Sequence, residues 1–234
     1  MDKKIYGIFV AGGSGTRMQS STPKQFLPLC GAPILQRTIE NFLEACPKMK
    51  VITVLPKAYM PHWKELCIEH NLLCPQILVA GGITRFHSVQ NALKKVPDGA
   101  IVAIHDGVRP FVSGELINNL LETAAKDGAA IPVTPSVDTL KSLTLTEDGS
   151  LLDEGAPDPD RSKVWRVQTP QVFRSEDIKA AYRQGFDISF TDDGSVARKM
   201  GMKISYVQGD GNNIKITTPE DLPPAEFLYR RREE

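Results

Sequence analysis

The sequence predicts an α/β fold in which a mostly parallel central sheet carries helices on both faces. Two observations support this prediction. Short apolar runs rich in Val, Ile and Ala alternate along the chain with amphipathic stretches at helical spacing. The chain has 234 residues, of which 41% are hydrophobic, and this is enough for one sizeable core. Strand–helix alternation is typical of a parallel sheet, and we expect a single domain over residues 1–234.

Five apolar runs are expected to be buried parallel strands, because apolar residues fill both of their faces. They are IYGIFV from Ile5, VITVLP from Val51, QILVA from Gln76, AIVAIHD from Ala100 and AAIPV from Ala129. The spacing of apolar residues elsewhere predicts helices, the first of which starts at Pro33 with the proline in its first turn. Further helices are expected over residues 86–96 and 117–124.

The alternation of strands and helices stops near residue 138. Residues 138–164 show strand-like alternation around an Asp148-Gly149 turn, followed by a patch rich in Pro and Asp. This pattern predicts a protruding β-arm rather than a linker. Its apolar face would be buried against a partner subunit, so we expect a homodimer that forms through the arm.

The last third of the chain is expected to return to the α/β pattern. Helices are predicted at Ser175–Gln184 and after Thr191, followed by a strand in KISYVQG. Near the C-terminus, an N-cap signal made by Thr218, Pro219 and Asp221 predicts the start of a final helix. Pro223 and Pro224 predict that this helix is kinked or restarts there.

Composition excludes several classes of protein. Lys plus Arg and Asp plus Glu both total 28, so no overall field draws the chain to nucleic acid or to an anionic membrane. No apolar run approaches transmembrane length, and the first one continues into a glycine-rich loop, which favours a strand over a signal peptide. The four cysteines form no Cys-x-x-Cys pair and have no histidine at zinc spacing. They indicate reduced thiols in a cytoplasmic protein.

The glycine-rich loop is VAGGSGTRMQSSTPKQF, at residues 10–26. It lacks the Gly-x-x-x-x-Gly-Lys-[Ser/Thr] pattern of a Walker A loop. A dinucleotide-binding fingerprint would need glycine or alanine where Met18 stands, and an acidic residue where the second strand ends in Pro56-Lys57. Two alternatives remain. The loop either cradles a triphosphate, with charge supplied by Arg17 and Lys24, or is a solvated turn.

Two further charged residues stand at informative places. Asp106 ends a predicted buried strand at the edge where open α/β sheets bind ligands, so its carboxylate could hold a divalent cation or cap the strand. His105 beside it is interpreted as a packed histidine without a chemical role. Lys215 lies between Ile214 and Ile216, so a strand there would point it away from its apolar neighbours, toward the site. The alternative is a lysine that protects a sheet edge.

Seven motifs occur in order and span nearly the whole chain. They are AGGSGTRM…PKQFLPL, GGITRFHSVQNAL, IHDGVRPFVS, VDTLK, VQTPQVF, TDDGS and NNIKITTPEDL. The ordered series closely resembles the 2-C-methyl-D-erythritol 4-phosphate cytidylyltransferases of the non-mevalonate isoprenoid pathway. The resemblance implies a Rossmann-like nucleotidyltransferase fold and the transfer of CMP from CTP to 2-C-methyl-D-erythritol 4-phosphate, with release of pyrophosphate. It also implies magnesium or another divalent cation as cofactor, and a homodimer with interlocked arms.

The resemblance assigns roles residue by residue. The catalytic residues would be Arg17 and Lys24, which stabilise the developing charge, together with Arg161 and Lys215, which position the phosphate of the second substrate for in-line attack. Arg161 would reach the substrate of the neighbouring subunit. The CTP-binding residues would be Ala11, Gly12, Gly13, Gly15, Gly82, Ser88 and Asp106, with Asp106 also the metal ligand. The second substrate would contact Arg109, Thr139 and Thr169. Arg85 is expected to brace the Gly81-Gly82 turn. The chain departs from the family pattern at Ile83, Gly194 and Arg198. At Ile83, base selection would be affected if the family's contact is made by the side chain and kept if it is made by the backbone.

Two other hypotheses stay open. A ribitol 5-phosphate cytidylyltransferase would share the fold, the loop and the chemistry, although TRFHSV and VDTLK favour the isoprenoid enzyme. A nucleotide-binding protein without activity is the second alternative, and the presence of Arg17, Lys24, Asp106 and Lys215 argues against it. In either transferase the nucleophile is a phosphate oxygen that is already anionic, so no general base is needed. The catalytic task is then to hold two polyanions together and to stabilise the charge that develops.

Overall fold

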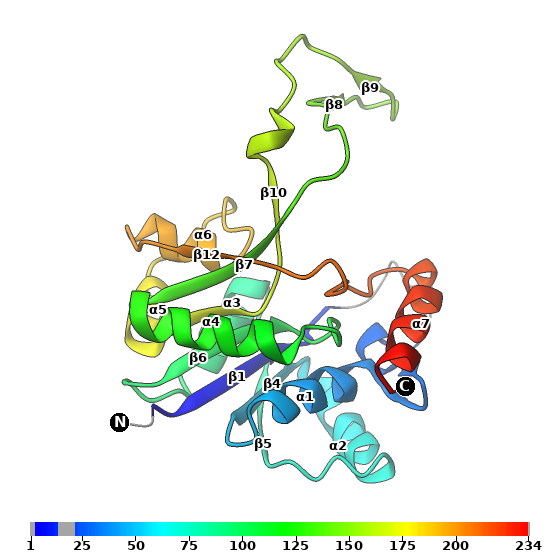
Figure 1. Ribbon diagram of the computed structural model, residues 1–234, viewed down its shortest axis with the longest axis vertical. Helices are drawn as coiled ribbons and strands as arrows, with labels where there is room; N and C mark the ends of the chain where they lie inside the picture. The colour runs from blue at the N-terminus through cyan, green and yellow to red at the C-terminus, as the bar shows by residue number, and fades with distance from the viewer. Residues whose placement is uncertain (1–2, 14–21, 234) are drawn as a thin grey trace.

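A computed structural model of the protein describes residues 3–13 and 22–233 and is built around one sheet (Figure 1). Within these ranges the main sheet has eight strands, in the hydrogen-bonded order β10-β7-β11-β6-β1-β4-β5, and β12 also pairs with β7. The sheet is mostly parallel and carries helices on both faces, as the sequence predicts.

All five predicted strands are present. They are β1 (Ile5–Val10), β4 (Lys50–Leu55), β5 (Gln76–Ala80), β6 (Ile101–Asp106) and β7 (Ala129–Pro135). β1 pairs in parallel with β4 and β6, and β4 pairs in parallel with β5. The carboxyl ends of these four strands therefore meet at one edge of the sheet.

The strands that follow residue 164 complete the sheet. They are β10 (Trp165–Val167), β11 (Gln171–Arg174) and β12 (Ser205–Gln208). β11 lies between β6 and β7 and is antiparallel to both, while β12 is parallel to β7. The arm leaves the sheet at the carboxyl end of β7 and returns there, so the strand after it must run in the opposite direction.

Helices cover both faces of the sheet. One face packs against α1 (Ile34–Ala45), α2 (Met60–Glu69) and α4 (Gly114–Asp127), and the other against α3 (Arg85–Leu93), α5 (Ser175–Ala181) and α6 (Asp193–Lys199). Successive strand residues alternate between the two cores. Phe9 and Val51 belong to the first, and Ile8 and Ile52 to the second. Burial on both faces explains why these strands are apolar throughout.

A third, smaller apolar cluster lies under the last helix, α7 (Leu222–Glu233). It contains Leu29, Ile34, Val108, Ile216 and Ala225. The short hairpin of β2 (Pro28–Leu29) and β3 (Ala32–Pro33) and the 3₁₀ turn η2 (Lys24–Phe26) lie next to it in the chain. This cluster joins the segments that contain Lys24 and Lys215, although the two lysines lie far apart in the sequence.

Some element boundaries differ from the predictions. α1 begins at Ile34, and Pro33 is its N-cap rather than its first residue. α5 ends at Ala181, short of the predicted Gln184. α7 begins at Leu222, directly after the 3₁₀ turn η5 (Pro219–Asp221), which agrees with the predicted restart. Its prolines lie in the first turn, where their missing amides have no helical partner.

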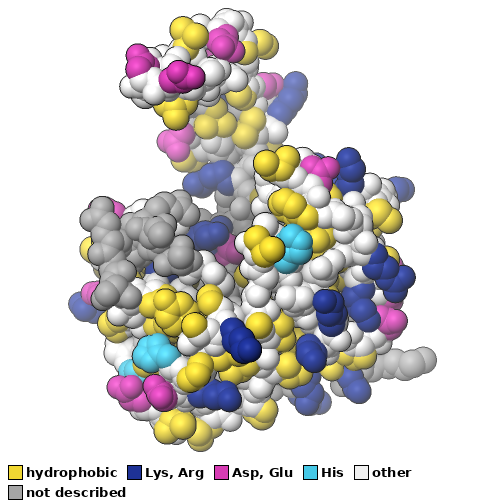
Figure 2. Space-filling model, turned by 180° about the vertical axis from the view of Figure 1, so that it is seen from behind, with side chains coloured by type: hydrophobic (Ala, Val, Ile, Leu, Met, Phe, Trp, Pro, Cys, Tyr) yellow, Lys and Arg dark blue, Asp and Glu magenta, His cyan; other side chains and the backbone are white. Residues whose placement is uncertain are grey.

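The arm, residues 138–164, projects from the body (Figure 1). It carries a two-stranded hairpin of β8 (Thr144–Leu145) and β9 (Leu151–Leu152) and the 3₁₀ turn η4 (Arg161–Lys163). Hydrophobic side chains gather on it at the surface (Figure 2). Leu143, Leu145, Leu151 and Leu152 are all exposed. The predicted protruding arm is therefore present, and its role in a dimer stays a prediction.

The helices of the described ranges are too short or too polar to cross a bilayer.

The four cysteines are free thiols and are partly buried. Burial raises the pKa of the Cys67 thiol to about 11, which keeps it protonated and unreactive near neutral pH.

Candidate active site

A cleft of about 490 Å³ opens at the carboxyl ends of β1 and β6. Eight of the residues predicted to bind CTP or to act on it line this cleft. They are Ala11, Gly12, Gly13, Lys24, Gly82, Ser88, Asp106 and Lys215. Gly15 and Arg17, which the sequence also assigns to the site, lie outside the described residues. The position of the cleft agrees with the general rule that open α/β sheets bind ligands at the carboxyl edge.

Asp106 is the centre of a cluster of charges in this cleft. It is 8% exposed and ends β6. Lys215 Nζ lies 3.0 Å and Arg109 Nε 3.2 Å from its Oδ2, while Arg85 Nε lies 3.8 Å from its Oδ1. Burial alone would raise the pKa of Asp106, but the charges of Arg85, Lys215 and Arg109 outweigh it and hold that pKa well below its usual range. Asp106 is therefore a carboxylate surrounded by three cations.

A chain of hydrogen bonds connects the backbone of Asp106 with Thr169, His105 and the carbonyl of Arg109. The amide of Asp106 donates to Thr169 Oγ1 at 3.0 Å. His105 Nε2 lies 2.9 Å from the carbonyl oxygen of Arg109, which can only accept, so Nε2 carries the ring proton. Nδ1 then accepts from the Thr169 hydroxyl at 3.0 Å. Burial lowers the pKa of His105 to about 4, so the ring is a neutral packed group, as predicted. The Thr169 hydroxyl is engaged in the interior, and its contact with substrate stays a prediction.

Arg85 is held by Asp193, a partner to which the sequence analysis gave no role. Its Nη1 and Nη2 donate to the two oxygens of Asp193 at 2.8 and 2.7 Å. Asp193 is fully buried and also accepts from the Tyr182 hydroxyl. Arg85 thus ties the start of α3 to the start of α6 and lies beside Asp106, which is a wider role than bracing one turn.

At Gly194, a Cβ would lie 2.5 Å from Ile131 Cδ1, so a larger residue there would require the Ile131 side chain to shift.

The turn before α3 is fixed by Ser88. Its Oγ accepts from the Gly82 amide at 3.0 Å and donates to the Thr84 carbonyl at 2.9 Å. A Cβ at Gly82 would lie 2.4 Å from His87 Cβ, so only glycine fits. The Ser88 oxygen keeps one lone pair that can accept a hydrogen bond from a ligand. The Ile83 side chain is 96% exposed and has no polar atom, so at this position only the backbone can form hydrogen bonds with a nucleobase.

Lys24 and Lys215 approach the cleft from two segments that contact each other. Lys24 begins η2, and its Nζ donates to the Ile216 carbonyl at 3.3 Å. Residues 213–217 form no strand, which corrects the prediction for Lys215. The segment is held instead by the Ile216 amide, which donates to the Val108 carbonyl at 3.0 Å. Ile216 is buried and Lys215 is exposed, so the predicted alternation still directs the lysine to Asp106.

The residues predicted for the second substrate are divided between the body and the arm. Arg109 contacts Asp106 and donates to the Asn213 carbonyl at 2.8 Å. Thr139 and Arg161 belong to the arm, and Arg161 Nη1 donates to the Val137 carbonyl at 3.2 Å. Neither arm residue lines the cleft of its own chain. The body therefore assembles the nucleotide end of the site, while the arm residues stand apart from it.

The donor set around Asp106 fits one kind of metal ion. In the part of the chain that the structure describes, no three His, Cys, Asp or Glu side chains cluster in a way that could hold a metal. A single carboxylate suits Mg²⁺, which commonly takes one or two protein carboxylates, substrate phosphates and water as its ligands. Among the residues that the structure describes, Oδ2 of Asp106 contacts two cations and Oδ1 faces Arg85 alone, so Oδ1 is the oxygen suited to a metal.

Asn213 is a further residue that the sequence analysis missed. It is fully buried, and its Nδ2 donates to the Thr169 carbonyl at 2.9 Å. The backbone carbonyl of Asn213 accepts from Arg109. Asn213 therefore connects Thr169, which contacts the Asp106 amide, with Arg109, which contacts the Asp106 carboxylate. Both Asn213 and Asp193 belong to motifs that identify the family, NNIKITTPEDL and TDDGS. A buried polar residue inside such a motif is the signal that could have indicated them.

Comparison with known proteins identifies the family. The model of the family described as IspD, 2-C-methyl-D-erythritol 4-phosphate cytidylyltransferase, matches residues 5–231. A protein of that name from Bacteroides fragilis is 46% identical over 221 residues, which cover 94% of this chain and 97% of the relative. One from Porphyromonas gingivalis is 42% identical, with 97% and 99% covered.

Solved structures of similar proteins share the fold. The 4-diphosphocytidyl-2C-methyl-D-erythritol synthase of Anaerococcus prevotii has a TM-score of 0.77 and 30% identity, covering 98% of this chain and 97% of that one. The 2-C-methyl-D-erythritol 4-phosphate cytidylyltransferase of Thermus thermophilus has a TM-score of 0.74 and 29% identity, covering 98% and 100%. The family resemblance seen in the seven motifs is confirmed. This chain belongs to the family of 2-C-methyl-D-erythritol 4-phosphate cytidylyltransferases.

Proposed function

We propose that this chain transfers CMP from CTP to 2-C-methyl-D-erythritol 4-phosphate, forming 4-diphosphocytidyl-2-C-methyl-D-erythritol and pyrophosphate. The observation that carries the proposal is the group of cations around Asp106, in a cleft at the carboxyl edge of the sheet. Membership of the family supports the identity of both substrates.

The chemistry of this transfer matches what the cleft contains. The attacking phosphate oxygen is anionic at neutral pH, so the reaction needs positive charge and positioning rather than a base. Lys24 and Lys215 present ammonium groups at the cleft, and Arg109 presents a guanidinium beside Asp106. Such fixed charges stabilise the negative charge that develops on the α-phosphate and on the departing pyrophosphate. His105 is neutral and hydrogen-bonded on both ring nitrogens, which suits a structural role.

Selection of cytosine is assigned to the turn that Ser88 holds. The exocyclic amine of cytosine is a donor, and the remaining lone pair of the Ser88 oxygen can accept from it. The backbone amides of Gly12 and Gly13 line the same cleft and can donate to the acceptor atoms of the base.

We also propose Mg²⁺, with other divalent cations as substitutes, as the cofactor. Asp106 would hold it through Oδ1, together with the phosphates of CTP. Bound there, the ion would neutralise charge on the phosphate oxygens. The neighbouring cations keep Asp106 ionised, so its carboxylate is available as a ligand.

The site is proposed to be completed by a second copy of the chain. Thr139 and Arg161 are on the arm, outside the cleft of their own chain, and the arm exposes four leucines. Pairing of arms in a twofold dimer would bury these leucines and bring Arg161 to the second substrate of the neighbour. We place the reaction in the cytoplasm, since the four free thiols suit a reducing compartment.

A pyrophosphate-release assay tests the proposed reaction. The purified chain is given CTP and Mg²⁺ with either 2-C-methyl-D-erythritol 4-phosphate or ribitol 5-phosphate, and omission of each component provides the controls. We expect release with the first alcohol phosphate and little with the second. Release with ribitol 5-phosphate alone would replace the proposed substrate. CTP binding without release from either would favour the nucleotide-binding protein.

A further inference from the structure

Asp221, the last residue of η5, forms a capping box with the N-cap residue Thr218, and its carboxylate also reaches one residue further back along the chain. Its Oδ2 accepts from the amides of Thr217 and Thr218, at 2.7 and 2.9 Å. The Thr218 hydroxyl lies 3.4 Å from the same oxygen. Burial would raise the pKa of Asp221, but the hydrogen bonds from Thr218 and Thr217 lower it overall, so the acceptor is a carboxylate. One ionised oxygen therefore fixes two consecutive residues of the loop before η5.

These two residues follow directly after residues 213–216, the segment that presents Lys215 to the cleft. The Thr217 hydroxyl donates to the Lys215 carbonyl at 2.9 Å. The Ile216 amide donates to the Val108 carbonyl, and the Ile216 carbonyl accepts from Lys24 Nζ. A displacement of residues 217–218 would therefore move the backbone of Lys215 and the oxygen that Lys24 contacts.

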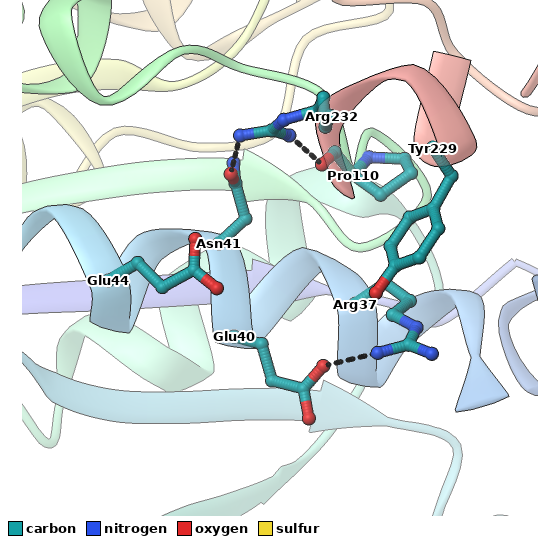
Figure 3. Close-up of a pocket in the computed structure, with 7 residues that line it drawn as sticks. All are labelled: Arg37, Glu40, Asn41, Glu44, Pro110, Tyr229 and Arg232. Carbon is teal, nitrogen blue, oxygen red and sulfur yellow. Dashed lines mark hydrogen bonds and ion pairs between the residues drawn. The ribbon is translucent and has the colours of Figure 1, made fainter. Parts of the chain in front are cut away.

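The other end of α7 anchors this arrangement to the body. Figure 3 shows Tyr229 and Arg232 of α7 facing Arg37 and Asn41 of α1. The Arg37 guanidinium lies 4.5 Å from the centre of the Tyr229 ring, and Arg232 donates to Asn41 Oδ1 at 2.7 Å. Arg232 also donates to the carbonyl of Pro110, in the loop that follows Asp106. α7 is thus fixed at its far end, while the residue just before its first turn holds the lysine segment.

We infer that Asp221 is a positioning residue for cytidylyl transfer, which holds the segment 213–218 so that Lys215 and Lys24 face the cleft. The inference rests on the proposed function. Asp221 does not line the cleft itself, and it acts through the backbone of its neighbours. Misplacement of a catalytic group by about 1 Å can cost up to about 10²-fold in rate.

The primary test compares Asp221→Ala with Glu220→Gln. Glu220 is the adjacent carboxylate, is exposed and has no hydrogen-bond partner among the described residues, so its change serves as the matched control. We expect Asp221→Ala to lower kcat about tenfold, with a smaller change in KM for CTP. Asp221→Asn keeps one acceptor oxygen and should retain more activity than alanine. Glu220→Gln should match the wild type, and equal kcat in all four proteins would overturn the inference.

A double-mutant cycle separates positioning from a general loss of stability. If Asp221 acts through Lys215, Asp221→Ala should lower kcat much less in a Lys215→Ala background than in the wild type. Its effect on the urea midpoint should be the same in both backgrounds, because the hydrogen bonds are lost in each. A tenfold loss of kcat in both backgrounds would mean that Asp221 does not act through Lys215.

Hydrogen exchange provides a measurement that needs no turnover. Peptides covering residues 213–218 should exchange faster in Asp221→Ala than in Glu220→Gln, including at the Ile216 amide. Unchanged protection of Ile216 would overturn the positioning role. An inactive wild type with this exchange pattern would instead refute the proposed function and leave the fixation of the segment supported.

Discussion

The cleft and the arm differ in how far along the chain their contacts reach. In the cleft, Arg109 binds the carbonyl of Asn213 across 104 residues and Lys24 binds that of Ile216 across 192. Among the described residues, the side-chain hydrogen bond of the arm with the widest sequence separation joins Arg161 to Val137, which is 24 residues away. The charges of the cleft are thus placed by the whole fold of one chain, whereas the shape of the arm is set by near neighbours.

This difference bears on how each region can act. Fixed charges in a cleft stabilise a transition state best when no reorganisation is needed, and long-range contacts provide that rigidity. Most of the arm's side-chain contacts are exposed and short-range, such as the ion pair of Lys141 with Asp158, and exposed ion pairs contribute little to stability. A region of this kind can adapt to a partner. The body is therefore suited to nucleotide chemistry, and the arm to assembly.

Removal of the charge of Asp106 should have the largest effect. Asp106→Asn keeps the shape of the side chain but leaves three cations without their central anion and weakens the proposed metal ligand. We expect kcat/KM to fall by about 10³-fold, the upper range for loss of an oriented electrostatic group. Initial rates across a Mg²⁺ titration measure this, and circular dichroism checks the fold.

The arm supplies a matched control for this change. Asp158→Asn removes an exposed carboxylate that pairs with Lys141, and it should leave the rate near that of the wild type. Full activity of Asp106→Asn at every Mg²⁺ concentration would show that Asp106 is no metal ligand.

Loss of one cation of the cleft should have a smaller effect. Lys24→Ala is expected to lower kcat by about 10²-fold, because the ammonium group stabilises charge that develops in the transition state. The KM for CTP should change much less. Lys141→Ala removes a lysine of the arm, and its steady-state rates should stay near the wild-type values. A loss confined to KM would mean that Lys24 binds only the ground-state phosphates.

The two regions were also predictable to different degrees. The arm hairpin followed from its Asp148-Gly149 turn, and Gly149 has a φ of +84°, which glycine adopts without strain. Asp148 Oδ1 accepts from the Ser150 amide two residues on, so the information is local. Whether the arm contacts a partner, and with which side, depends on a second chain and does not follow from this local pattern.

The fold and part of the cleft were predictable because apolar patterns identify buried strands. Asp106 could be placed at the carboxyl edge because it ends such a strand. The pairing of Arg85 with Asp193 could not be predicted, since 108 residues separate them and no periodicity connects them. The capping pair of Thr218 and Asp221 was predicted from the N-cap signal and is confirmed. The further contact of Asp221 with the Thr217 amide was not predicted, because a capping pattern gives no information on the path of the loop before the N-cap.

Subunit mixing tests whether the arm serves the partner's cleft. If Arg161 acts on the neighbouring site, a heterodimer of Lys24→Ala and Arg161→Ala chains has one site with both lesions and one with none. Random exchange makes half of the dimers heterodimers, so about a quarter of the wild-type activity should return.

The pair Lys24→Ala and Asp106→Asn is the control. Both changes lie in the cleft of one chain, every site of its heterodimers keeps one lesion, and no activity should return. Exchange is confirmed by native mass spectrometry of chains with different tags. If the Lys24 and Arg161 pair also fails to recover after exchange, Arg161 acts within its own chain or on no site, and the cleft does not depend on the partner's arm.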